Sequence, residues 1–107
     1  MKKAPKWMQG VLWSVNVEKL DVDRNKSYVI TQSLNHGNVK ILEWIFKNFS
    51  KDEIVSEIIN PMRGVWYPRV LNYWQKKLEV KIPEEKYQKA IKRLYDVKNN
   101  QNVLANN

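Results

Sequence analysis

The sequence predicts an all-α fold, a small single-domain bundle of about five helices. Apolar residues recur three and four positions apart through most of the chain. Residues that start and stop helices stand between these apolar runs. With 107 residues, 43% of them hydrophobic, and five tryptophans, the chain is long and apolar enough to bury one core. It has no cysteine, so no disulfide framework is expected.

The beginning of the chain is expected to be less regular than the rest. Residues 1–10 are predicted to be a basic flexible arm, and residues 11–97 to be the single helical domain. The apolar part of the first segment is too short and too interrupted for a signal peptide. From Trp7 onward the pattern fits neither the helical nor the strand period, which indicates an extended lead-in with a short helical turn near residues 17–20.

Capping residues bound the next two helices. Asp21 or Asp23 is expected to cap a helix that runs to about Asn35. Gly37 is expected to end it in the left-handed conformation that glycine adopts easily. Asn38 is expected to cap a second helix, VKILEWIFKNF. The apolar residues of this second helix occupy one broad face: Ile41, Leu42, Ile45, Phe46 and Phe49.

A capping box marks the start of the third helix. The Ser50 hydroxyl can accept a hydrogen bond from the N–H of Glu53, and the Glu53 carboxylate can accept one from the N–H of Ser50. The helix is expected to end before Pro61 and Gly64. Its apolar face comprises Ile54, Val55, Ile58 and Ile59.

Prolines mark the starts of the last two helices. Pro68 suits the first position of a helix that runs to about Leu78, because an N–H at that position has no partner within the helix. Pro83 has the same role before the stretch PEEKYQKAIKRLY, whose two glutamates lie at the positive end of the helix. Residues 98–107 have no apolar face with which to join the core and are predicted to be a disordered tail.

The stretch YPRVLNYWQKK, at residues 67–77, predicts a helix with two distinct faces. One side is expected to be core: Val70, Leu71, Trp74 and Leu78. The other side is the candidate functional face: Arg69, Asn72, Tyr73 and Lys76. These residue types contact phosphates and base edges in DNA complexes, and tyrosine and arginine also anchor protein interfaces. The face could therefore bind nucleic acid or a partner protein, and a plain solvated surface is the third alternative.

Charge is distributed unevenly along the sequence. The net charge of +8 arises from +3 in residues 1–6, −1 in residues 7–60 and +6 in residues 61–107. This positive charge favours an anionic partner such as nucleic acid, an acidic protein or a membrane surface. The alternative is that the lysines form a solvated surface without a partner. A helix-turn-helix unit at residues 51–78 is also an alternative, although the turn is longer than usual. The last predicted helix adds a supporting basic face: Lys86, Lys89 and Arg93.

The sequence contains no recognisable motif for catalysis, for a cofactor or for a metal site. His36, the single histidine, is interpreted as a C-terminal residue that interacts with the helix dipole. Carboxylate pairs such as Asp52 and Glu53 lie at helix starts, where capping explains them. The tryptophans are interpreted as packing residues, with Trp66 expected to be partly exposed. We therefore expect no enzymatic activity and no cofactor.

Packing residues in about two thirds of the chain form a pattern. Its pieces are LWSVNVEKL at 12–20, Ile30, Leu34, Gly37, Trp44, Ile54, Ile58, PRVLNYW at 68–74 and Leu78. The pattern resembles a family of small uncharacterised bacterial and archaeal helical domains with a Leu-Phe-Trp-Asp-Val-Asp-like start and a Leu-Asn-Phe-Trp-like helix. Ser14 and Asn16 stand where the family often has aspartates. Many members are encoded beside nucleotidyltransferase-type toxins, so the resemblance implies an antitoxin-like or accessory role without catalytic residues.

These patterns together predict a basic, cytoplasmic protein without catalysis. Its expected role is that of an antitoxin-like or accessory protein-interaction module. The expected partner is another protein, and the resemblance implies a nucleotidyltransferase-type toxin. The alternative is a helix-turn-helix DNA-binding protein, and an autoregulatory antitoxin would combine both activities. No membrane span is expected, because no stretch reaches the roughly 20 apolar residues that one requires.

Overall fold

The computed structural model describes residues 2–93 and confirms the predicted all-α class. Within this range the chain forms five α-helices and two short 3-10 helices. They are η1 (Lys6–Met8), η2 (Val17–Lys19), α1 (Lys26–His36), α2 (Val39–Asn48), α3 (Lys51–Ile59), α4 (Pro68–Lys77) and α5 (Glu84–Ala90). No β-strand occurs in these residues, and Trp66 and Ile91 form an isolated parallel bridge.

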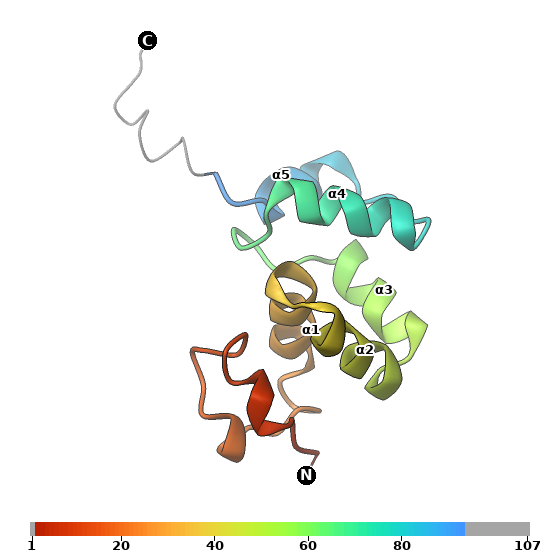
Figure 1. The fold of residues 1–107 in the computed structure, drawn as a ribbon. Coiled ribbons are helices and arrows are strands. Elements are labelled where there is room, and N and C mark those ends of the chain that lie inside the picture. The colour runs from red at the N-terminus through yellow and green to blue at the C-terminus, as the bar shows by residue number, and fades with distance from the viewer. Residues whose placement is uncertain (1, 94–107) are drawn as a thin grey trace, which may run out of the picture.

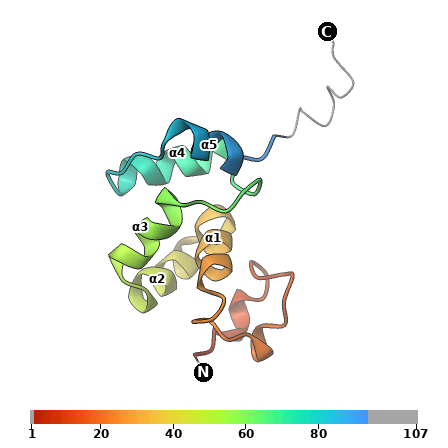
Figure 2. The ribbon, with the colours of Figure 1, turned by 180° about the vertical axis from the view of Figure 1, so that it is seen from behind.

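Helix α1 is the central element of the fold (Figure 1). It packs against α2, α3 and α4, and α3 also packs against α4. Helix α5 lies beside α4 at one end of the molecule. The N-terminal segment with η1 and η2 lies at the other end, as the view from behind also shows (Figure 2). Helix α1 therefore connects two regions that are far apart.

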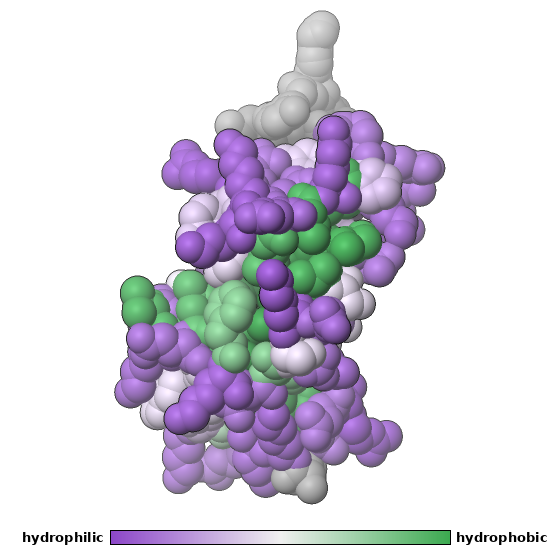
Figure 3. Space-filling model, turned by 90° about the vertical axis from the view of Figure 1, so that its right-hand side faces the viewer, coloured by the Kyte–Doolittle hydropathy of each residue, from purple (hydrophilic) through white to green (hydrophobic). Residues whose placement is uncertain are grey.

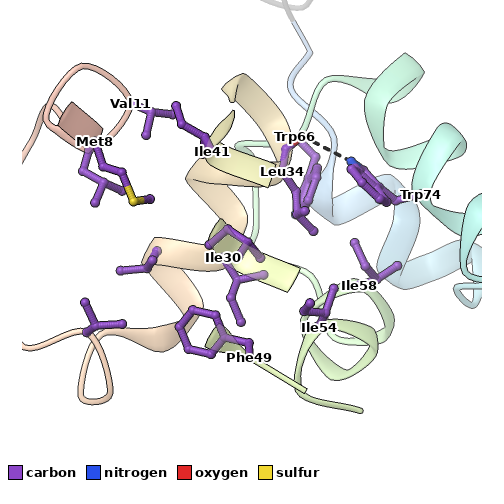
Figure 4. Close-up of a cluster of buried hydrophobic side chains, with 14 of the residues drawn as sticks. Met8, Val11, Ile30, Leu34, Ile41, Phe49, Ile54, Ile58, Trp66 and Trp74 are labelled. Atoms are coloured by element: carbon purple, nitrogen blue, oxygen red, sulfur yellow. Dashed lines mark hydrogen bonds between the residues drawn. The ribbon is translucent and has the colours of Figure 1, made fainter. Parts of the chain in front are cut away.

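One hydrophobic core runs from the N-terminal segment to α4. Figure 4 shows Met8 at one end, Trp74 at the other, and Ile30 and Leu34 of α1 between them. The Trp74 side chain also donates its Nε1–H to the carbonyl oxygen of Leu34 at 3.2 Å, which ties α4 to α1. The predicted core face of α4 is confirmed, because its members are buried or half-buried: Val70, Leu71, Trp74 and Leu78.

The first residues of the chain differ from the expected flexible arm at 1–10. Ala4 and Met8 are buried in the core. The Lys2 ammonium donates to the carbonyl of Asn48 at 2.7 Å, and the N–H of Val22 donates to the carbonyl of Lys2 at 2.9 Å. Residues 2–10 are therefore packed against the domain. Burial of the two apolar side chains favours this packing, while the lysines keep their charged ends near the surface.

Two predicted caps are confirmed by their hydrogen bonds. The Asn38 side chain accepts from the N–H of Ile41 at 3.0 Å and starts α2. Ser50 and Glu53 form the complete capping box of α3, with distances of 3.1 Å from Glu53 N to Ser50 Oγ and 2.8 Å from Ser50 N to Glu53 Oε1. Pro68 occupies the first turn of α4, as expected. Local chemistry thus fixes where these three helices begin.

The prediction that Asp21 or Asp23 caps α1 is wrong. Asp21 Oδ1 accepts from the N–H of Asp23 at 3.1 Å and from that of Arg24 at 3.4 Å, in the turn that precedes the helix. The turn satisfies the Asp21 carboxylate, and α1 begins later, at Lys26.

Gly37 ends α1, but not in the predicted left-handed conformation. Its φ is −81° and its ψ is 164°, which is extended backbone open to any residue. The need for glycine has another cause: a Cβ atom would lie 2.4 Å from the Ser33 carbonyl oxygen and 2.8 Å from Ile41 Cγ2. The close approach of α1 and α2 therefore excludes a side chain here. Gly64 is the glycine with positive φ, at 74°.

The last helix is shorter than predicted. Helix α5 ends at Ala90, because the following residues leave it to pair with the segment before α4. The N–H of Trp66 donates to the carbonyl of Ala90 at 3.0 Å, and the N–H of Lys92 donates to the carbonyl of Trp66 at 2.7 Å. Trp66 is wholly buried, which overturns its expected partial exposure. The last two residues of the predicted helix, 94 and 95, and the predicted tail at 98–107 lie outside the described residues.

Candidate functional site

Helix α4 presents the predicted candidate face on one side. Its four members are all exposed: Arg69, Asn72, Tyr73 and Lys76. Leu71 and Trp74, which are buried, hold the opposite side of the helix against the core. The structure therefore brings the four residues together as one stripe along the surface of a well-anchored helix.

An aromatic group crosses from this stripe to α2. Tyr73 is 53% exposed and packs edge-on against Trp74, with ring centroids 5.0 Å apart. Phe46 of α2 is 43% exposed and packs against the same Trp74 ring at 5.8 Å. We call these three residues the α2–α4 aromatic face. The sequence pattern placed Phe46 on the apolar side of its helix, but it could not indicate that the ring stays largely exposed among the described residues.

Apolar exposure continues around this region. Figure 3 views the molecule from its α2–α3 side and shows apolar side chains gathered in the middle, with hydrophilic side chains above and below. Val39 lies on α2 seven residues before Phe46, on the same side of the helix, and is also exposed. Apolar residues that are only partly buried lie on α2, α3 and α4 and after α4: Leu42, Val55, Ile59, Val70 and Val80. Contiguous apolar surface of this kind is typical of interaction sites.

Exposed cations lie on the same two helices as the aromatic face, and a tight turn follows α4. Arg69, Lys76 and Lys77 of α4 are exposed, as is Lys47 of α2. After α4 the chain turns through Glu79, whose φ of 57° lies in the left-handed region that usually requires glycine. A shallow hollow is formed beside this turn. It is lined by Asn72, Gln75, Lys76, Glu79, Val80 and Lys81.

The supporting basic face is only partly assembled. Lys86 and Lys89 are exposed on α5 and line a hollow with Arg63. Lys86 donates to the Asn60 side chain at 2.7 Å, and Lys89 lies 3.5 Å from a Glu85 carboxylate oxygen. Arg93 does not join them on a helix face as predicted, because α5 ends before it.

The Arg93 guanidinium is directed back along its own chain. It donates to the backbone and side-chain oxygens of Gln88. The Lys86 and Lys89 ammonium groups therefore form a smaller basic surface than the sequence suggested.

A long connection separates the two helices of the helix-turn-helix unit expected at 51–78. Helices α3 and α4 are in contact, but residues 60–67 separate them, and Trp66 in this connection is buried and paired with the chain after α5. A helix-turn-helix unit usually has a turn of about three or four residues. Helix α3 also carries three carboxylates, Asp52, Glu53 and Glu57, which would repel phosphates.

His36 lies in a second aromatic group, away from α4's exposed stripe. Its ring packs edge-on between Trp13, at 4.9 Å, and Tyr67, at 5.3 Å. Burial lowers the pKa of His36, and the nearby charge of Lys92 lowers it further. Both effects favour the neutral imidazole over the charged form. His36 is the last residue of α1, as expected from the sequence.

Two further properties of the described residues are relevant to function. No group of three or more His, Cys, Asp or Glu side chains in residues 2–93 could hold a metal ion. None of the helices in this range has both the length and the apolar character that a membrane crossing requires.

Comparison with known proteins identifies a similar family. Residues 8–58 match the model of a family of unknown function, DUF6922. This segment is just under half of the chain, contains α1, α2 and most of α3, and ends before α4. Searches of curated proteins and of solved structures found no match. The match is consistent with the expected similarity to small uncharacterised domains, and it leaves the exposed stripe of α4 outside the matched segment.

Proposed function

We propose that this protein is a non-catalytic interaction module that binds another protein through the α2–α4 aromatic face. One observation carries the proposal: Tyr73 and Phe46, on neighbouring helices, both leave much of a large ring in water while packing on the buried Trp74. Aromatic side chains held in this way lose little conformational freedom on binding and are common anchors of interfaces.

The positive charge of this part of the molecule indicates which kind of partner protein would bind. Arg69 and Lys76 lie on the same exposed stripe of α4 as Tyr73, Lys47 is exposed next to Phe46 in the sequence, and residues 61–107 carry a net charge of +6. A partner surface with an apolar centre and an acidic rim would match this pattern and would be attracted from a distance. An acidic partner protein therefore fits better than a basic or neutral one.

The resemblance seen in the sequence supports a more specific role. Domains with a similar pattern are often encoded beside nucleotidyltransferase-type toxins, which suggests that the partner is such a toxin and that the protein acts as an antitoxin or accessory subunit. The cytoplasm is the compartment that this role implies. The family match over residues 8–58 concerns the segment that contains Phe46, whereas Tyr73 lies beyond it.

A titration against the purified product of the adjacent gene tests this proposal. Tyr73→Ala should weaken binding by on the order of 2 kcal/mol, with little dependence on salt, because an aromatic anchor loses buried area rather than charge. Trp13→Leu is the matched control, since it removes another exposed aromatic ring outside the face. Absence of binding, or equal losses in both variants, would contradict the proposal.

Duplex DNA binding through α4 is the second candidate. The observation in its favour is that Arg69, Asn72 and Lys76 share one exposed stripe, which could enter a major groove. Lys76→Ala should then reduce the salt slope of binding by about one unit, and Asn72→Ala should relax sequence preference. If the protein fails to bind duplex DNA even at low salt, this candidate is eliminated.

A further inference from the structure

A hollow lined by two exposed tryptophans lies between the N-terminal segment and the junction of α1 and α2. Its lining includes Trp7, Trp13, His36, Asn38 and Ile41, and we call it the tryptophan hollow. Trp13 is 59% exposed and Trp7 43% exposed. Leaving two indole rings in water is unfavourable, and no element in residues 2–93 covers them. The protein-interaction proposal makes no use of this region.

Trp13, in the wall of the hollow, is the first of three aromatic rings that pack on one another. Trp13 packs on His36 with an interplanar angle of 67°, and His36 packs on Tyr67 with an angle of 82°. These edge-on contacts fix the position of the Trp13 ring while leaving most of it accessible. A flat ring entering the hollow would therefore meet a stacking surface that is already in place.

The hydrogen bonds of Asn35 determine which nitrogen of His36 carries the proton. Asn35 is buried, and its Nδ2 donates to the carbonyl of Val65 at 2.9 Å. The same Nδ2 lies 3.3 Å from His36 Nε2, so this ring nitrogen must accept. Asn35 Oδ1 is occupied by the N–H of Tyr67 at 3.2 Å. A neutral His36 with Nε2 as acceptor carries its proton on Nδ1, which is a donor for a carbonyl or phosphate oxygen.

Two lysines give this region a positive charge. Lys40 Nζ lies 4.3 Å from the centre of the Trp7 ring, and Lys92 Nζ lies 5.5 Å from that of Tyr67. The protein's own cations thus already use these two rings, and a cationic ligand would be repelled. The combination of stacking rings with flanking lysines instead matches a ligand that contains both flat rings and negative charge.

We propose that the tryptophan hollow binds single-stranded nucleic acid, with a base stacked on Trp13 and the flanking phosphates near Lys40 and Lys92. A single strand is required, because the bases of a duplex are stacked on each other and their ring faces are not accessible. Asn38 Nδ2, whose partner Oδ1 caps α2, and His36 Nδ1 supply donors for the edge of the base. Stacking on indole rings is tolerant of sequence, so the expected preference is for single strands in general.

A titration of the full chain with a labelled oligothymidine of about 12 nucleotides tests the proposal, with oligouridine of the same length as a second arm. The affinity is expected to be measurable at about 50 mM salt and to fall by about 200 mM. Trp13→Leu should weaken binding by about tenfold or more, because leucine keeps apolar bulk but has no ring to stack. Trp13→Phe should bind nearly as well as the unaltered protein. Lys40→Gln should reduce the salt slope by about 0.7 units if it meets one phosphate.

Lys51→Gln, which removes one exposed cation at the start of α3, is the matched control for Lys40→Gln and should leave both the affinity and the salt slope as they are in the unaltered protein. Circular dichroism of each variant checks that the helical fold is intact. The proposal is overturned if the oligonucleotide does not bind at the lower salt concentration, or if folded Trp13→Leu binds it unchanged. It is also overturned if an acidic aromatic peptide occupies the hollow while the oligonucleotide does not, or if duplex of the same sequence binds more tightly than the single strand.

Discussion

The two exposed aromatic surfaces of this molecule are held in place by different forces. The α2–α4 aromatic face stands on regular helices, and its central ring, Trp74, is buried and donates to Leu34 of α1. The tryptophan hollow has one wall made of residues 7–13, which include only part of a short 3-10 helix. Apolar burial positions the first surface, whereas the second needs additional polar bonds.

Glutamine side chains supply many of those bonds in the N-terminal segment. Gln9 Nε2 donates to the carbonyls of Leu12 at 3.0 Å and Val15 at 2.7 Å, and Gln9 Oε1 accepts from the N–H of Val17 at 3.0 Å. Gln32 of α1 donates to the carbonyl of Val11 at 3.0 Å. These bonds replace the backbone bonds that a regular helix would provide. The comparison indicates that the two surfaces can be damaged separately, by substitutions of different kinds.

The largest expected effect is loss of the ring at the centre of the α2–α4 aromatic face. Trp74→Ala should destabilise the protein by about 3–5 kcal/mol, because it leaves a cavity and removes the bond to Leu34. Trp13→Leu should cost less than about 1 kcal/mol, since most of that ring is already in water. Urea unfolding followed by circular dichroism measures both. Similar losses for the two variants would show that the surfaces are not held differently.

Gln9 provides the corresponding test of the tryptophan hollow. Gln9→Ala should destabilise residues 9–17 by about 1–2 kcal/mol, since three backbone groups lose their side-chain partner and must turn to water. Amide hydrogen exchange should accelerate in this segment and remain unchanged in α4. Gln75→Ala is the matched control, because Gln75 Oε1 accepts from the N–H of Ile82 at 2.8 Å and should affect the turn after α4 alone. Accelerated exchange throughout the protein would contradict this prediction.

Local rules predicted several helix starts correctly and failed where distant residues decide the structure. Asn38, Ser50 and Pro68 were recognisable because caps and first-turn prolines act within about four residues. The end of α5 was missed, since Ile91 leaves the helix to pair with Trp66, which is distant in the sequence. No local pattern contains that information.

The same reasoning applies to the surfaces. The exposed stripe of α4 could be predicted, because helical spacing alone separates the two sides of one helix. The tryptophan hollow could not, because Trp13, His36 and Tyr67 come from three segments that only the tertiary fold brings together. A tryptophan in an irregular apolar stretch resembles a core residue until its neighbours are known.

A substitution at Ser50 tests how much the stability of the helical region depends on its capping residues. Ser50→Ala should destabilise the protein by about 1 kcal/mol, because the N–H of Glu53 loses its acceptor at the start of α3. Thermal or urea unfolding measures the change, and Ser56→Ala, an exposed substitution within the same helix, is the control. A neutral Ser50→Ala with an intact fold would mean that α3 does not rely on this cap.

The capping box also gives α3 a pH dependence. The backbone N–H of Ser50, and then Lys26 at 2.9 Å, favour the charged form of Glu53 and lower its pKa. A carboxyl group with a lowered pKa in the folded state contributes stability above its unfolded pKa and loses it as pH falls through the folded value. Glu53→Gln should therefore flatten the decrease in stability below about pH 5. An unchanged slope in urea unfolding at several pH values would contradict this assignment.

The smallest expected effect concerns the turn that follows α4. Glu79 has a φ of 57°, and the bonds from its N–H to the Lys76 carbonyl and from the Val80 N–H to the Gln75 carbonyl form a Schellman motif, in which glycine is usual. Glu79→Gly should stabilise the protein by about 0.5 kcal/mol, because relief of left-handed strain slightly exceeds the added freedom of the unfolded chain. Glu79→Ala keeps the strain while removing the charge and is the control for electrostatics. If glycine and alanine raise stability equally in urea unfolding, charge rather than strain is the cause. In that case the left-handed conformation of Glu79 would not reduce the stability of the protein measurably.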